Sequence, residues 1–104
     1  MESFIGQIIM MASNFIPKGF MPCDGRFIPI QQNAALYSLL GTTYGGDGVT
    51  NFALPNLVSK VPIHQTTSNP VQKVMVSGHG EDTSIATTQI LYCICVQGLY
   101  PSRD

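Results

Sequence analysis

Charged side chains are scarce in this sequence of 104 residues. Five Lys or Arg and six Asp or Glu make up 11% of the chain and leave a formal net charge of −1, whereas roughly 25% of an ordinary soluble domain is charged. Hydrophobic residues reach 44%. So few charges cover the surface of a monomer poorly, and we infer that uncharged polar residues and partner chains cover much of it. The length is that of one domain with a modest core.

Runs of basic residues are also missing. The five basic residues are scattered, and a net charge near zero attracts neither nucleic acid nor an anionic membrane. The apolar N-terminus, MESFIGQIIMMAS, carries Glu2 and has no Lys or Arg before Lys18, unlike a signal peptide. It is too short to span a bilayer. We therefore expect no nucleic-acid partner, no membrane insertion and no recognisable signal peptide.

Patterns of metal ligands and catalytic residues are absent as well. His64 and His79 are 15 positions apart and belong to no ligand spacing, although a metal shared by one His from each subunit stays open. The adjacent Glu81 and Asp82 are typical of a solvated loop. No nucleophile elbow or cofactor fingerprint occurs. The sequence therefore predicts no metal site, no cofactor and no enzyme activity.

The three cysteines do not form a zinc pattern either. Cys93 and Cys95 are two positions apart on an expected strand, so they share a face about 6.5–7 Å apart, beyond the usual reach of a disulfide. We predict that both are small core residues. Cys23 lies in an expected turn, where pairing with a partner chain stays open, and so does the redox state of all three thiols.

Glycine is concentrated in one stretch, Leu39 to Pro62, which reads LLGTTYGGDGVTNFALPNLVSKVP. Three glycines surround Asp47, and glycine serves mainly to turn the backbone where a side chain would be strained. A phosphate-binding loop would need Gly-Lys-Ser/Thr before a helix, and a calcium loop would need several alternating oxygen ligands. We therefore predict a long ordered loop that is held to the core by three apolar anchors, Phe52, Leu54 and Leu57.

Strands are expected on both sides of this stretch. Phe4–Met11 is apolar on both faces, so we predict a first strand whose two faces are both covered. Asp24-Gly25 predicts a tight turn into a strand over 26–30. Further segments with strand character are Lys60–His64, Val71–Ser77, Thr83–Thr88 and Ile90–Val96.

One helix is expected, from Gln31 to Leu40. Its buried face has the three-four spacing of an amphipathic helix, and Gly41 is placed to end it. The residues of this face are Ala35, Leu36, Leu39 and Leu40.

The glycine-rich stretch carries a family resemblance. Gly41–Leu57, GTTYGGDGVTNFALPNL, resembles the signature of the phage tail-collar domain family, which includes short tail fibres and bacterial proteins labelled microcystin-dependent. Phe4-Ile5-Gly6, Cys23-Asp24-Gly25 and Leu99–Arg103 match in the same order. The resemblance implies a mainly β (small α+β) fold, a compact tail-collar-type β domain with one short helix and long ordered loops. Residues 1–64 would form its core, and residues 65–104 would add the C-terminal strands of the same domain.

Two departures from the family pattern matter. Longer members carry an insertion before the final strand, with a His-containing segment that binds metal in the trimer core of fibre tips, whereas here Thr88-Gln89 leads directly into Ile90. The segment that would be expected to bind a receptor is therefore missing, and only the structural core of the domain remains. Members usually have Ser where this chain has Gln31, which weakens the N-cap of the helix by roughly 1 kcal/mol.

These observations predict a non-catalytic structural protein of the tail-collar or tail-fibre type, in a virion tail or extracellular appendage. It would assemble with copies of itself, into a trimer or a longer filament, and with other tail or fibre proteins. The predicted subunit contacts are the apolar strand residues Ile9, Met11, Ile94 and Val96.

The alternative is a receptor-binding module at a fibre tip. Its loop would recognise a cell-surface glycan through Tyr44, Asp47, Thr50 and Asn51, although the same side chains are equally suited to binding the loop's own backbone.

Overall fold

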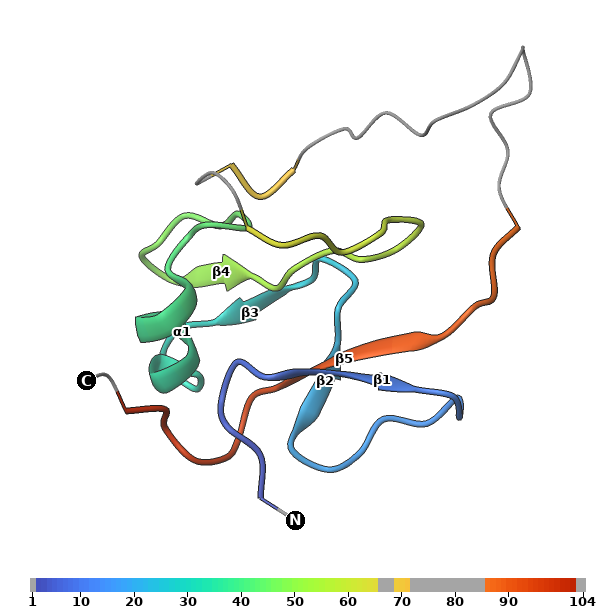
Figure 1. The fold of residues 1–104 in the computed structure, drawn as a ribbon. Helices are drawn as coiled ribbons and strands as arrows, with labels where there is room; N and C mark the ends of the chain where they lie inside the picture. Colours follow the sequence, from blue (N-terminus) through green and yellow to red (C-terminus); the bar gives the residue numbers. More distant parts are fainter. Residues whose placement is uncertain (1, 66–68, 72–85, 103–104) are drawn as a thin grey trace.

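The computed structural model describes residues 2–65, 69–71 and 86–102. In this part of the chain, two small antiparallel sheets lie beside one short helix (Figure 1). The mainly β fold with one short helix and long loops is therefore confirmed. The elements in chain order are β1 (Ile8–Met11), β2 (Phe20–Pro22), β3 (Phe27–Pro29), α1 (Ala34–Leu40), β4 (Asn51–Ala53) and β5 (Leu91–Cys95).

The three-stranded sheet joins the two ends of the sequence. Its order is β1-β5-β2, so β5 lies between two strands from the N-terminal quarter (Figure 1). Cys93 is the central register position, opposite Ile9 on one side and Pro22 on the other. The expected strand at Ile90–Val96 is confirmed, one residue shorter at each end.

The second sheet pairs β3 with β4, and Ile28 lies opposite Phe52. Ile28 is 4% exposed while its neighbour Phe27 is exposed, as expected for a strand that is covered on one face. The turn before β3 uses Gly25 at a φ of 80°. There, the Asp24 carboxylate accepts hydrogen bonds from the backbone N–H and the guanidinium of Arg26.

The helix begins later than expected. Its N-cap is Asn33, not a residue at position 31, so the absent Ser there does not bear on the cap. Leu36 is fully buried, whereas Ala35 is exposed, which corrects the expected buried face. Gly41 ends the helix as predicted, and its N–H donates to the carbonyl oxygen of Tyr37 at 2.7 Å.

The core lies between the two sheets and the helix. Phe52 and Leu54 are fully buried, and Leu57 packs against the same cluster. All three expected anchors of the glycine-rich stretch are therefore confirmed. The rings of Phe52 and Tyr37 are 5.3 Å apart in a tilted arrangement, which is favourable for an aromatic pair.

Two expected strands differ from the structure, and one observed strand was not expected. The first strand begins at Ile8, because Phe4 forms only an isolated bridge to Leu99 and a turn follows it. Residues 60–64 are exposed and are not a strand, so that prediction was wrong. β2 lies in the turn-rich segment 14–25, where no strand was expected. Most of the segments at 71–77 and 83–88 lies outside the described residues.

Candidate functional site

The register of the three-stranded sheet sorts its side chains into two faces, because residues directly opposite each other share a face. Ile94 lies opposite Ile8 and Met21, and Ile94 and Met21 belong to the hydrophobic core. This is the core face. The other face carries Ile9 and Met11 of β1, together with Phe20, Pro22, Leu91, Cys93 and Cys95. Every residue of that face is apolar.

The four predicted subunit contacts fall into two groups. Ile94 is 1% exposed and Val96 is 9% exposed, and both belong to the intrachain core. Their surfaces are therefore already covered by the chain itself. Ile9 and Met11 lie on the opposite face of the sheet and are half-buried, so they have surface left to offer a partner.

Four half-buried residues of that second face form one group, which we call the outer patch; Phe20 is also half-buried but lies at the other end of the face, opposite Cys95. Ile9 and Pro22 flank Cys93 from the two sides, and Met11 lies opposite Leu91. Pro22 was missed in the sequence because β2 was not expected. Leu91 was missed because its pairing with Met11 of β1 is long-range. The outer patch consists of Ile9, Met11, Pro22 and Leu91.

The edge strand β1 is not covered within the chain on its core side either. Ile8 is 41% exposed and Met10 is 65% exposed. The expectation that both faces of this strand are covered is therefore wrong for the single chain. It holds only for the central strand β5, in which Cys93, Ile94 and Cys95 are all buried.

The three cysteines are free thiols and are buried, which confirms Cys93 and Cys95 as small core residues. Burial first, and then nearby Cys93 and Asp24, raise the pKa of Cys23 to about 12. Burial also raises the pKa of Cys93. A raised pKa keeps a thiol protonated, and the thiolate is the nucleophile, so Cys23 and Cys93 are suited to packing.

The carboxylate of Asp47 is engaged by its own loop. Its Oδ1 accepts hydrogen bonds from the backbone N–H groups of Val49, Thr50 and Asn51 at 2.8–3.0 Å, and its Oδ2 accepts one from the Thr50 hydroxyl. These bonds hold the pKa of Asp47 far below its usual range. Asn51 Oδ1 in turn accepts the N–H of Asp47.

Few hydrogen-bonding side-chain groups of the candidate glycan-binding loop therefore remain available to a ligand. The structure brings Asp47, Thr50 and Asn51 together, and uses their side chains to bind one another and the backbone. Tyr44 is different: the residue is 41% exposed and its side chain lies outside this network. The geometry favours a structural role for the loop, with Tyr44 as its freest side chain.

In the ranges 2–65, 69–71 and 86–102, no three His, Cys, Asp or Glu side chains gather into a possible metal site. His64 is exposed, whereas His79, Glu81 and Asp82 lie outside the described residues. Among the described helices, none has the length and apolar character that crossing a membrane requires.

Comparison with known proteins gives one match. The family model of the Phage Tail Collar Domain matches residues 6–62, more than half of the chain. No curated protein and no solved structure matches. The matched range contains β1, β2, β3, α1, β4 and the whole Asp47 network described above. The chain therefore belongs to the phage tail collar domain family.

Proposed function

We propose that this chain is a non-catalytic subunit that associates with copies of itself, into a trimer or a longer fibre, through the outer patch. Membership in the tail collar family indicates a structural role in a phage tail fibre and a place in the virion tail. The finer statements, self-association and its location, rest on the apolar, half-buried character of Ile9, Met11, Pro22 and Leu91. Other tail or fibre proteins are further candidate partners.

The physical reason to expect a contact at the outer patch is that its exposed apolar surface contributes favourable free energy when it is removed from water. Fully burying one aliphatic side chain contributes about 1.5–3 kcal/mol, and the residues of the outer patch still have part of this to gain. The patch also lies beside an edge: β1 and β2 are the outer strands of their sheet in the described part of the chain. An edge strand can pair with a strand of another copy, which would fix the orientation of the contact.

The substitution Ile9→Lys tests this proposal. The ammonium group of a lysine on the outer patch would lose its hydration in the contact. In the monomer, the apolar stem of the lysine can lie along the patch while its ammonium group reaches solvent. We expect the variant to be folded but monomeric by size-exclusion chromatography with light scattering. Val49→Lys is the matched control, because Val49 is 80% exposed and lies in the loop between α1 and β4. An Ile9→Lys protein that assembles like the control would refute this interface.

Receptor binding stays a second candidate, and one observation favours it. Tyr44 exposes 41% of its surface next to a loop that Asp47 holds rigid, and rigid aromatic side chains suit sugar recognition because they combine an apolar ring with a polar tip. A glycan array would test it. Binding that is lost on Tyr44→Ala with oligomeric state unchanged would support this function, and the absence of any bound glycan would dismiss it.

A further inference from the structure

The outward backbone groups of β1 are open to a further strand. The backbone N–H and C=O of Cys95 both bond the segment that leads into β1, each at 2.9 Å, so they point toward β1. Because backbone groups point to alternate sides along a strand, those of Cys93 also face β1 and meet Ile9 opposite. The N–H and C=O groups of Ile8 and Met10 therefore point away from the sheet. They have no hydrogen-bond partner within the described part of the chain.

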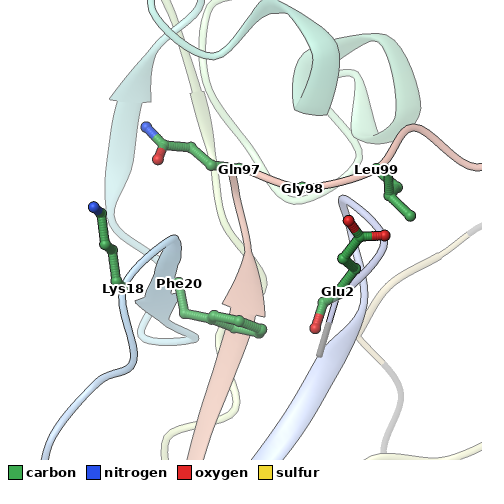
Figure 2. A pocket seen from close by; sticks show the side chains of 7 residues that line it. Glu2, Lys18, Phe20, Gln97, Gly98 and Leu99 are labelled. Carbon is green, nitrogen blue, oxygen red and sulfur yellow. The ribbon is translucent and has the colours of Figure 1, made fainter.

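The outward edge of β2 offers no donor to another strand. Gly19 and Cys23 bond β5, so alternation turns the backbone groups of Phe20 and Pro22 outward. Phe20 lines the surface cavity of about 370 Å³ shown in Figure 2, and its N–H donates to the carbonyl oxygen of Pro17 at 3.1 Å. Pro22 has no N–H. Pro22 and the bond to Pro17 therefore protect this edge from strand addition.

The edges of the second sheet are largely occupied by the chain itself. On β4, the outward N–H groups of Asn51 and Ala53 both donate to the glycine-rich loop at 3.0 Å. On β3, Pro29 has no N–H, and its carbonyl oxygen accepts the side-chain amide of Asn33 at 2.9 Å. This leaves β3 a single outward N–H, at Phe27, which is too little for a ladder.

We propose that two copies of this chain pair through their β1 edges as antiparallel strands, a joint that rests on the self-association proposed above. Each partner in strand addition needs an open edge. Of the strands in the described ranges, only β1 has an edge with two free donors and two free acceptors. Antiparallel pairing is favoured because its hydrogen bonds are the more stable.

One register uses all of these groups. It places Ile9 of one copy opposite Ile9 of the other, so that Ile8 of each copy exchanges hydrogen bonds with Met10 of its partner. Directly opposite residues share a face, so Ile8 at 41% exposure and Met10 at 65% exposure would cover each other on the core side. On the other face, the two outer patches would become one continuous apolar surface.

Such a joint has two-fold symmetry, because the same edge is used on both copies. It builds dimers. The continuous outer patch of each dimer then remains for a contact with the next dimer, which extends the assembly into a filament. The proposed joint therefore selects even-numbered particles and filaments over trimers.

The substitution Ile9→Cys tests the register. Opposite residues of a non-hydrogen-bonded antiparallel pair have Cα atoms about 4.5 Å apart, within the range of about 4.4–6.8 Å that a disulfide spans. We expect a disulfide-linked dimer on a non-reducing gel after mild oxidation. Met11→Cys is the matched control on the same strand and face, because its counterpart in the other copy would lie about 14 Å away. The native cysteines are buried, so the wild type should give no linked dimer.

The substitution Met10→Pro tests the backbone of the edge. It removes an N–H that points away from β5, so the ladder within the chain keeps all its donors. Met10→Thr is the matched control, because it shortens the same side chain but keeps the N–H. We expect Met10→Pro to associate at least tenfold more weakly than Met10→Thr, since each dimer would lose two hydrogen bonds. Analytical ultracentrifugation measures the association, and thermal unfolding checks that both variants are folded.

The outcomes separate this joint from self-association in general. Single wild-type chains at every concentration would contradict both proposals. Assembly that survives Met10→Pro but is lost in Ile9→Lys would keep the outer patch as the contact and reject the β1 joint. Trimers would reject the joint as well, and so would Met11→Cys chains that cross-link as readily as Ile9→Cys chains.

Discussion

Asp47 organises the turn between α1 and β4 through the charge of its carboxylate. It accepts three backbone N–H groups and one hydroxyl, and these bonds favour the ionised form, which lowers the pKa of Asp47 below its ordinary value of 3.8. A carboxyl group whose pKa is lower in the folded state than in the unfolded state stabilises the fold above the unfolded pKa. That contribution is lost as the pH falls toward the folded pKa.

The Asp47→Asn variant tests this pH dependence. The amide keeps one acceptor oxygen but no charge, so at pH 7 we expect the wild type to have the higher urea midpoint of unfolding. As the pH falls below about 4, the wild-type carboxyl group becomes protonated in the unfolded state and the difference between the two midpoints should shrink. A difference that stays constant from pH 7 to pH 3 would show that the charge of Asp47 does not stabilise the loop.

Gly46 is the position in this loop where a side chain is least tolerable. Its φ is 102°, and a Cβ would collide with the Cα of Phe52 and approach the carbonyl oxygen of Asn51. We expect Gly46→Ala to lower the free energy of unfolding by more than the about 1–3 kcal/mol that backbone strain alone costs.

Gly6→Ala is the matched control for this substitution. Gly6 also has a positive φ, 89°, but a Cβ there would make only an ordinary contact, 3.7 Å from Leu39. Urea denaturation of both variants separates strain from collision. Equal losses in the two variants would mean that the loop moves to accommodate the alanine at position 46.

The helix is held by one fully buried side chain, Leu36. Replacing it by Ala should lower the free energy of unfolding by about 2–5 kcal/mol, the range for a large-to-small change in a core. Ala35→Ser, at an exposed neighbouring position, should change stability little. Chemical denaturation measures both. If Leu36→Ala cost no more than the exposed substitution, the helix would not be anchored to the core as the structure has it.

The sequence predicts local elements of this fold well. The anchors Phe52 and Leu54, the end of the helix at Gly41 and the turn at Gly25 follow from residue spacing and turn chemistry, and the structure has all of them. These features depend on neighbours in the chain. The family signature in the same stretch is confirmed by the match over residues 6–62.

Long-range pairing could not be predicted in the same way. The alternation of Val61 and Ile63 is typical of a strand, yet a strand needs a partner for its backbone, and these residues are exposed without one in the described part of the chain. β2 was missed for the opposite reason: its residues stand among turn formers, but the central strand β5 provides the ladder. The outer patch depends on long-range pairing of β1, β2 and β5, so the sequence predicted only its two residues on β1, Ile9 and Met11.

At the scale of the whole molecule, the two ends of the chain are interdependent. β5 completes the sheet that β1 and β2 begin, and the hydroxyl of Tyr100 lies 2.7 Å from the Ser38 hydroxyl on α1. We therefore propose that residues 1–64 and 65–104 form one domain. Such a unit presents its apolar outer patch on a fixed sheet, as a subunit of a fibre requires.

Negative-stain electron microscopy of the purified wild-type chain across a dilution series tests self-association most directly. The account predicts particles larger than one chain, either discrete trimers or rods and filaments, that persist on dilution and are absent from the Ile9→Lys protein. Trimers would make it a fibre tip or collar piece, and filaments would make it a polymerising subunit. Single chains at every concentration, in wild type and variant alike, would contradict self-association through the outer patch.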